Sequence, residues 1–247
     1  MGGIEDRYRE QGAADMFTDH EHRALVMGEA HARPRPPVSA PAAVSRVDLY
    51  CSDKDTRAHI DALAQRCEAA GQAPPPPEAR YHLFDAGRVR GAFERHTEFV
   101  SYTFSLDKPD GRPFEVTALG AAETGWLAEL PGKRLAAVHL HLLASKDGAL
   151  DSALCEQVFQ RTNFAASHIR GGDASAASDF RADADGFVRM LVFDSTPSDV
   201  VRGRMVQRLL ELETYRLGAL LALPAAREAN DTLMKLASEL DVMTDRP

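Results

Sequence analysis

The sequence predicts an α+β fold, in which helices pack on one face of a mainly antiparallel sheet. Short segments rich in β-branched and aromatic residues follow one another directly, and helical segments only occasionally separate them. Turn sequences such as Gly171-Gly172-Asp173 join several of these segments as hairpins. The longest helical segments lie together at the C-terminal end. Two split βαβ-like halves are an alternative arrangement of the same elements, although no sequence repeat marks them.

The first element is expected to be a leader, residues 1–43, that wraps onto the domain. Phe17 to Ala32 has the composition of a helix, and the proline-rich stretch from Arg33 to Pro41 ends it. Proline lacks an N–H and disfavours helical backbone in the residue before it. We therefore expect the α+β domain to span residues 44–197.

The alternation of apolar and polar residues predicts the remaining elements. Asp53 or Asp55 is expected to cap the first helix of the domain, and Gly71 to end it. Residues 80–106 are expected to hold two strands or one long bent pair, and residues 109–132 to be irregular with a helical turn near 124–130. The other expected strands are 44–50, 134–144, 165–170, 176–182 and 187–194, and the helices of the domain are 53–71 and 150–159.

The sequence of the C-terminal region, residues 198–247, predicts a long helix and the start of a coiled-coil stalk. Ser198 opens a helix that runs to about Leu223, and a second segment continues from Pro224 to about Thr244. Apolar residues recur there with alternating spacings of three and four, which is typical of a coiled-coil seam and indicates a homodimer through these helices. A short amphipathic helix folded back on the sheet would give a similar pattern. The seam positions are Ala226, Ala229, Leu233, Leu236, Leu240 and Met243.

Composition and charge exclude several functional classes. The chain has 247 residues, of which 44% are hydrophobic and 27% charged, values near the average for soluble globular proteins. The formal net charge of −8 and the lack of a basic run argue against nucleic-acid binding. No apolar run approaches the roughly 20 residues of a membrane helix, and the charged N-terminus does not match a signal peptide. These features predict a cytoplasmic protein, and its three cysteines, without a CxxC pair, are expected to be reduced packing thiols.

Polar residues occur where the patterns call for apolar ones. Glu94, His96 and Glu98 would share one face of a strand that continues into buried aromatic residues, while Arg95 would point the other way. Burying such a row costs several kcal/mol unless the side chains are paired, hydrogen-bonded or metal-bound. Glu213 falls within the apolar stripe of the long helix, with Arg216 at its flank. A buried acid requires a cationic partner, and Arg90, Arg95 and Arg189 are the candidates on the sheet.

Three interpretations of these residues stay open. The first is a structural network of Arg–Glu and His–Glu pairs that joins the leader and the long helix to the sheet. The second is a divalent metal site built from His31, His96, Glu94 and Glu98. The third is acid–base chemistry on the same side chains, with His139 or His141 added, since those two histidines share a strand face. No HExxH, P-loop, GxGxxG or GxSxG motif supports the second or third interpretation.

Four motifs in order resemble one uncharacterised bacterial family. They are GEAHARP at 28–34, FERHTEFVSYTF at 93–104, ASDFRADADGFVRMLVFD at 177–194 and QRLLELETYR at 207–216. The chain resembles the domain of unknown function DUF3422 from about Asp19 to its end. One departure is that the family often has a histidine where this chain has Ala182 or Ala184. The polar cluster that the resemblance implies is Glu29, His31, Arg33, Glu94, Arg95, His96, Glu98, Gln207, Glu213 and Arg216.

The resemblance implies a membrane-anchored parent protein. In that family a longer coiled coil and a pair of membrane segments follow the soluble region, so the parent would lie in the inner membrane through segments absent from this sequence. Two functional hypotheses follow. One is a cytoplasmic sensing or interaction domain that needs no cofactor. The alternative is a metal-dependent or acid–base enzyme that uses the His/Glu cluster around His96.

Overall fold

A computed structural model describes residues 19–21, 23, 36–160 and 163–244 of the chain. The chain divides into two compact units, Met1–Pro34 and Arg35–Pro247. The expected helix over residues 17–32, and with it Glu29, His31 and Arg33, lies almost wholly outside the described residues. The second unit carries the sheet and the helices that cover it.

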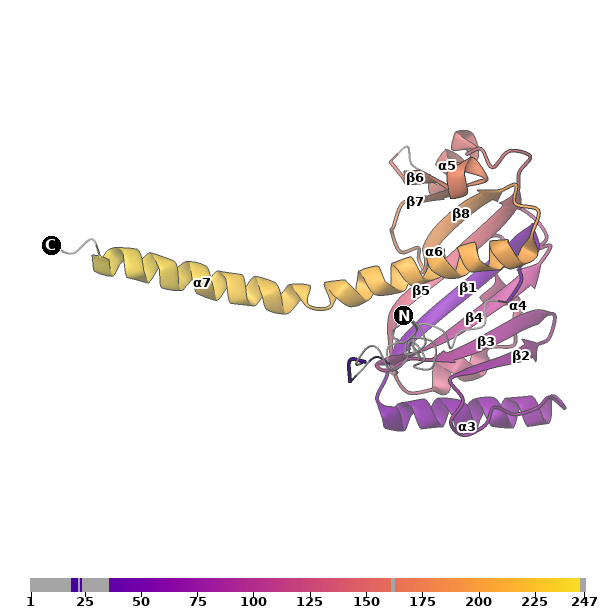
Figure 1. Ribbon diagram of the computed structural model, residues 1–247, viewed down its shortest axis with the longest axis horizontal. Helices are drawn as coiled ribbons and strands as arrows, with labels where there is room; N and C mark the ends of the chain where they lie inside the picture. The colour runs from indigo at the N-terminus through magenta and orange to yellow at the C-terminus, as the bar shows by residue number, and fades with distance from the viewer. Residues whose placement is uncertain (1–18, 22, 24–35, 161–162, 245–247) are drawn as a thin grey trace, which may run out of the picture. The chain divides into compact units, whose positions relative to one another are not determined.

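The second unit is built on one eight-stranded sheet with strand order β2-β3-β4-β1-β5-β8-β7-β6 (Figure 1). All neighbouring strands run antiparallel except β5 and β8, which are parallel. The predicted α+β class with a mainly antiparallel sheet is therefore confirmed. The strands are β1 (Ala42–Tyr50), β2 (Tyr81–Ala86), β3 (Val89–Arg95), β4 (Phe99–Asp107), β5 (Lys133–Ala144), β6 (Ala165–Ile169), β7 (Ala174–Ser178) and β8 (Val188–Asp194).

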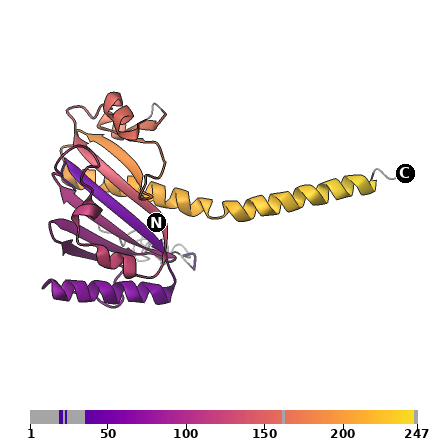
Figure 2. The ribbon, with the colours of Figure 1, turned by 180° about the vertical axis from the view of Figure 1, so that it is seen from behind.

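Helices cover both faces of the sheet, whereas the sequence predicted one covered face. The α4 backbone N–H of Leu119 donates to Ser45 of β1, and Thr214 of α6 donates to Asp48 of the same strand. Side chains three apart on a strand point to opposite faces, so α4 and α6 lie on opposite sides (Figures 1 and 2). The helices are α3 (Asp53–Ala69), α4 (Ala118–Ala121), α5 (Ser152–Phe159), α6 (Asp199–Leu220) and α7 (Leu223–Thr244), with short 3-10 turns at Gly125–Glu129 and Arg170–Gly172.

The region over residues 80–106 differs most from its prediction, because it holds three strands. A two-residue turn separates β2 from β3, and Gly87 takes the positive φ of +68° that this turn needs. A second turn over residues 96–98 separates β3 from β4. The first helix also begins differently, since Ser52 is its N-cap and Asp55 completes a capping box with it.

The two halves of the sheet share an order of elements but differ in strand direction. Each half runs strand, helix, then three strands, as β1-α3-β2-β3-β4 and β5-α5-β6-β7-β8. Their strand orders, 2-3-4-1 and 6-7-8-5, correspond. The closing pair is antiparallel for β1 and β4 but parallel for β5 and β8. In the second half, α5 connects β5 to β6, which run parallel in the sheet with β8 and β7 between them. In the first half, α3 connects β1 to β2, which run antiparallel. The chain therefore does not contain two equivalent βαβ-like halves.

Apolar packing holds a helix on each face. On one side Ile60, Leu63 and Cys67 of α3 pack against β-strand residues that include Phe93 and Tyr102. On the other side α6 packs Met205, Val206 and Leu210 against a separate cluster that includes Val138, Leu140, Leu142, Met190 and Val192. The three cysteines are free and buried, as the sequence predicted.

The start of α6 is held against the chain segment that precedes β1. Val38 donates its backbone N–H to the carbonyl of Asp199 at 3.1 Å. A Cβ at Gly203 would lie 2.2 Å from the carbonyl oxygen of Pro36, so only glycine allows this approach. Residues 36–38, which the sequence assigned to the leader, therefore pack as part of the domain.

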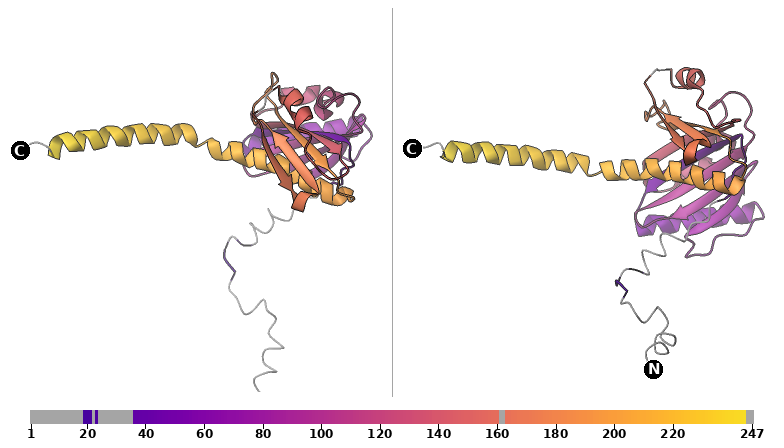
Figure 3. Two further views of the ribbon diagram at one scale, coloured as in Figure 1. Left: turned by 90° about the horizontal axis from the view of Figure 1, so that it is seen from above. Right: turned by 45° about the horizontal axis from the view of Figure 1, so that its top comes forward.

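The last helix, α7, continues beyond the sheet after a bend at residues 221–222 (Figure 3). Every α7 side chain whose placement is described is exposed, so α7 does not fold back on the sheet. The coiled coil stays a prediction. Among the described helices, none combines the length and apolarity that crossing a membrane requires.

Candidate functional site

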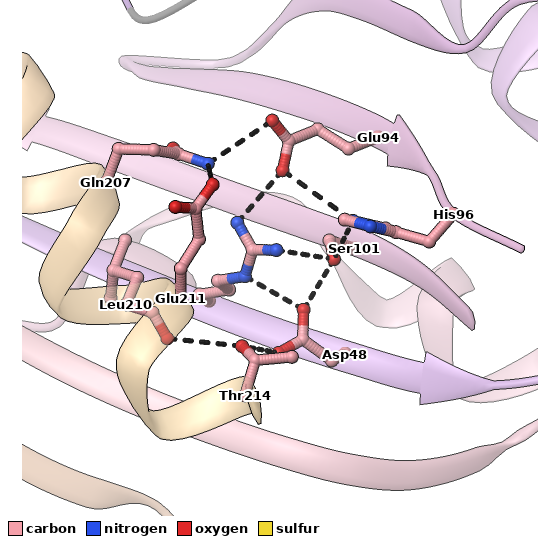
Figure 4. A network of polar contacts seen from close by, with 9 residues as sticks. Asp48, Glu94, His96, Ser101, Gln207, Leu210, Glu211 and Thr214 are labelled. Atoms are coloured by element: carbon pink, nitrogen blue, oxygen red, sulfur yellow. Dashed lines mark hydrogen bonds and ion pairs between the residues drawn. The ribbon is translucent and has the colours of Figure 1, made fainter. Parts of the chain in front are cut away.

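A buried arginine lies at the centre of the polar site. Arg46 of β1 is 1% exposed and lies beneath α6. Its Nε donates to Asp48 Oδ1 at 2.8 Å, its Nη1 to Glu94 Oε2 at 2.9 Å and its Nη2 to Ser101 Oγ at 2.8 Å (Figure 4). Strand register explains the arrangement, because Ser101 of β4 lies opposite Asp48 on one side and Glu94 of β3 on the other.

Helix α6 closes this site from above. Thr214 donates its hydroxyl to Asp48 Oδ2 at 2.5 Å, and Gln207 Nε2 lies 3.4 Å from Glu94 Oε1. Ser101 donates to Asp48 Oδ1 at 2.5 Å. Each carboxylate oxygen of Asp48 and Glu94 thus accepts a hydrogen bond from the protein. We call Arg46, Asp48, Glu94, His96, Ser101, Gln207 and Thr214 the Arg46 network.

The Arg46 network is charged. Burial alone would lower the pKa of Arg46, but the charges of Asp48 and Glu94 outweigh it and hold the pKa above its usual value. The guanidinium therefore stays protonated between its two acids. Removing one partner of such a buried pair leaves an uncompensated charge, which costs far more than the intact pair contributes.

His96 joins the network from a turn rather than from a strand. Its ring stacks on Phe99 with centroids 3.9 Å apart, and its Nε2 lies 3.1 Å from Ser101 Oγ and 4.0 Å from Glu94 Oε2. Ser101 already donates its one hydroxyl hydrogen to Asp48, so it accepts from His96, and Nε2 carries a proton.

The predicted row of Glu94, His96 and Glu98 on one strand face is wrong, because β3 ends at Arg95 and the chain reverses over the next three residues. The turn still buries Glu94 and His96 together, but it leaves Glu98 exposed. Arg95 points away from the network, as predicted, and lies 3.6 Å from Glu78 and 3.7 Å from Asp53.

Glu213 is fully buried on α6, as its place in the apolar stripe indicated. The expected partner on the sheet is wrong. Arg216, one turn further along the same helix, donates from Nε at 2.8 Å and from Nη2 at 2.7 Å to the two carboxylate oxygens. Of the sheet candidates, Arg90 pairs with Asp107, and Arg189 lies over the ring of Phe114. The Glu213–Arg216 pair borders a cavity of about 180 Å³, which Arg134, Phe180 and Leu217 also line.

His139 and His141 share one face of β5, as predicted, but this is the face opposite the Arg46 network. His139 Nδ1 lies 2.8 Å from Ser45 Oγ, and its ring stacks on Phe187. His141 Nδ1 accepts the backbone N–H of Phe114 at 2.8 Å. Burial lowers the pKa of both rings to about 4, so both are neutral at pH 7. Their expected role beside His96 is therefore wrong.

The metal hypothesis finds no support within the residues that the structure describes. No group of three or more His, Cys, Asp or Glu side chains there is arranged to hold a metal ion. Glu98, one of the predicted ligands, is exposed. His31 lies outside the described residues, so its share in a metal site stays a prediction, as does that of Glu29 and Arg33 in the polar cluster.

Sequence reasoning missed Arg46, Asp48, Ser101 and Thr214. Ser101 and Thr214 lie in the motifs at 93–104 and 207–216, whereas the signal for the other two was the alternation of Arg46 and Asp48 along β1, which is also the ordinary pattern of a strand with one exposed face. Neither Arg46 nor Asp48 lies in a motif on which the family resemblance rests.

A second buried ion pair, also missed, fixes the start of α6. Arg202 Nε lies 2.6 Å from Asp194 Oδ2 at the end of β8. The same guanidinium donates to the carbonyl oxygens of Val38 and Thr196 and to the carboxylate of Asp199. One side chain thereby joins β8, α6 and the segment before β1.

Comparison with known proteins places the chain in a family. The family model described as "Protein of unknown function (DUF3422)" matches residues 18–247. No curated protein and no solved structure matches the chain. The match covers nearly the whole sequence, so the chain belongs to the DUF3422 family, whose function is unknown.

Proposed function

We propose that this protein is an interaction domain, in which the α+β unit holds α6 in place and presents the outer face of α6 and α7 to a partner. One observation carries the proposal: the inner face of α6 is held on the sheet by apolar and polar contacts, and the exposed face of its C-terminal half carries the apolar residues Leu212 and Tyr215, whereas Arg204 and Arg208 are exposed nearer its start. Ordinary surface helices place polar residues on their solvent side.

The inner face of α6 supports a holding role. Thr214 and Gln207 bond to the buried acids Asp48 and Glu94 of two different strands, and Arg202 binds Asp194. These polar contacts accompany the apolar contacts of Met205, Val206 and Leu210. Hydrogen bonds require a defined geometry, so they fix the rotation of α6 more strictly than apolar packing alone.

The outer face supports a binding role. Leu212 and Tyr215 on α6 are 56% and 55% exposed, and Leu233, Leu236 and Leu240 on α7 are at least as exposed. Isolated exposed apolar residues are common, but a continuous row of them marks an interaction surface.

The cellular setting that we propose is the cytoplasmic side of the inner membrane, with anchoring through segments beyond residue 247. The family resemblance supports this setting. Fractionation of the native host protein tests it, because an anchored parent stays with the membrane pellet after a high-salt wash. Recovery in the supernatant contradicts anchoring and leaves the interaction role intact.

A photo-crosslinking residue tests the binding role directly. It is placed in the full chain at Leu236, on the outer face of α7, and in a matched control at Ser238, which lies on the opposite side of the same helix. We expect protein adducts in host cells from position 236 and far fewer from position 238. No adduct from either position, or equal adducts from both, contradicts the proposal.

Hydrogen exchange tests the holding role. Thr214→Val removes the bond to Asp48 with little change in volume, and we expect roughly tenfold faster exchange in α6, which corresponds to about 1.4 kcal/mol. Exchange in β1 and β4 should change less. Thr232→Val on exposed α7 is the matched control, and equal acceleration throughout the sheet in Thr214→Val contradicts a specific hold on α6.

A further inference from the structure

A subset of the exposed apolar residues of α6 and α7 forms one continuous heptad pattern, whereas Leu220, Leu221 and Met234 are exposed outside it. From Leu212 to Met243, ten of the apolar residues lie at spacings that alternate between three and four. This pattern is longer than the six α7 positions alone, because it begins on the outer face of α6. We call it the outer seam: Leu212, Tyr215, Ala219, Ala222, Ala226, Ala229, Leu233, Leu236, Leu240 and Met243. All ten residues are exposed.

We infer that a second copy of this chain packs along the outer seam as a two-stranded coiled coil. The inference rests on the proposed function, since it names the partner of the same surface. Heptad a and d positions suit another helix with the same spacing, and a second copy supplies such a helix in the same register. A flat or grooved partner would not require the spacing to alternate over more than four successive heptads.

Only a two-residue turn, residues 221–222, separates the two helices. Leu221 has right-handed helical backbone angles, with φ of −59° and ψ of −28°, and Ala226 donates to the carbonyl of Ala222 at 3.0 Å. Pro224 lies in the first turn of α7, where its missing N–H costs little. The sequence spacing of the outer seam, from Ala219 to Ala222 to Ala226, is the same across this turn as within the helices.

The outer seam is large enough for a specific interface. It spans 32 residues, or about 48 Å at 1.5 Å per residue. Six of its residues are large apolar side chains that are 55% to 72% exposed. At about 60–120 Å² for each fully buried side chain, these residues and the four alanines bring the buried area near the ~500 Å² per partner of a minimal specific interface.

The residues beside the outer seam are compatible with self-association. Glu211 and Arg216 occupy g and e positions, so in a parallel pair the Glu211 of one copy faces the second copy's Arg216. The four alanines in the middle allow close approach of the two helices. The inner-face residue Thr214 is bound to the sheet and lies off the seam, and Glu211 links the seam to the Arg46 network through the hydrogen bond that it accepts from Gln207 at 3.0 Å.

Sedimentation of the purified chain at micromolar concentrations tests the inference, and we expect a concentration-dependent dimer. Leu236→Glu places a charge in the seam and should raise the dimer dissociation constant more than about tenfold. Met234→Glu is the matched control, because Met234 is 65% exposed on the same helix but lies outside the seam. Circular dichroism checks that both variants keep their helices.

A monomer at all concentrations, or equal weakening by both variants, overturns the inference. If a dimer forms, engineered cysteines report whether its two helices run parallel or antiparallel, since the three native thiols are buried. Leu236→Cys alone forms a disulfide dimer if the helices are parallel, whereas Ala219→Cys with Leu236→Cys crosslinks if they are antiparallel, and either result supports the seam. If crosslinking at position 236 in cells captures only a different protein, the second copy is excluded but the interaction role stands.

Discussion

The two faces of the sheet bury polar side chains in opposite ways. Beneath α6, Arg46 is charged and shared by two acids, and its pKa is raised. On the other face three buried histidines, His59, His139 and His141, are neutral because burial lowers their pKa. The same sheet therefore accommodates ionised groups where opposite charges meet, and neutral groups where apolar packing surrounds them.

Hydrogen-bond direction shows how the neutral face is organised. His59 Nε2 lies 2.9 Å from the carbonyl oxygen of Pro131, which can only accept, so Nε2 carries the proton. Its Nδ1 then accepts the hydroxyl hydrogen of Tyr102 at 3.1 Å. His141 likewise accepts at Nδ1 from a backbone N–H. Protonating Nδ1 of His59 or His141 would break the hydrogen bond that this atom accepts. Neutralising Asp48 or Glu94 would instead leave the positive charge of Arg46 only partly paired.

The largest expected effect comes from removing the shared cation. Arg46→Met leaves the carboxylates of Asp48 and Glu94 buried without their shared cation. We therefore expect the free energy of unfolding, measured by urea denaturation, to fall by about 3–5 kcal/mol. Arg57→Met is the control, because its ion pair with Asp61 is exposed and should contribute less than about 1 kcal/mol. A loss for Arg46→Met no larger than that of the control would show that the face beneath α6 does not depend on charge.

Acid should destabilise the neutral face. The unfolded chain binds protons at histidine near pH 6.5, whereas folded His139 and His141 do so only near pH 4. Their contribution is therefore complete above about pH 6.5 and is lost as the pH falls toward 4. At pH 5 the expected loss is about 2 kcal/mol for each ring, measured as the change in unfolding free energy from pH 7.

One variant isolates this pH effect. His141→Asn keeps an acceptor for the backbone N–H of Phe114 and removes the titrating ring, so stability should depend less on pH between 4 and 6.5. His168→Asn, at an exposed site on β6, is the control and should leave the slope unchanged. An equal slope in the wild type and in His141→Asn would refute the histidine explanation.

Glu213 tests whether the charged face extends along α6. Glu213→Gln weakens its two bonds from Arg216 at a fully buried site, and we expect a loss of about 1–3 kcal/mol in unfolding free energy. Glu228→Gln on exposed α7 should change stability by less than about 0.5 kcal/mol. An unchanged denaturation midpoint for Glu213→Gln would confine the charged region to the Arg46 network.

The smallest expected difference is also the most closely matched. Ser101 and Ser45 are both fully buried, on opposite faces of the sheet. Ser101→Ala removes bonds to charged Arg46 and Asp48 and should cost about 1.5–3 kcal/mol, whereas Ser45→Ala removes neutral bonds and should cost about 0.5–1.5 kcal/mol. Calorimetry on both variants measures the difference, and a larger loss for Ser45→Ala would reverse the comparison.

Local patterns predicted part of the candidate site. Glu213 was expected to be buried because helical spacing places it among apolar residues, and His139 and His141 were expected to share a face because they are two apart on a strand. Glu94 and His96 do meet, but through a turn rather than along a strand. The sequence did not show which partner Glu213 takes, because Arg216 at position i+3 of the same helix and the arginines on the sheet were all possible partners.

The sequence on its own determined the class of fold, most of its strands and helices, and the heptad spacing of its last two helices. These properties depend on the order of neighbouring residues, because periodicity and turn residues act over a few positions. Only the tertiary structure decided that α6 covers the second face of the sheet. Covering that face turns Arg46 and Asp48, an ordinary polar pair on β1, into the centre of a buried network. Burial and charge pairing arise between distant segments, and no local pattern records them.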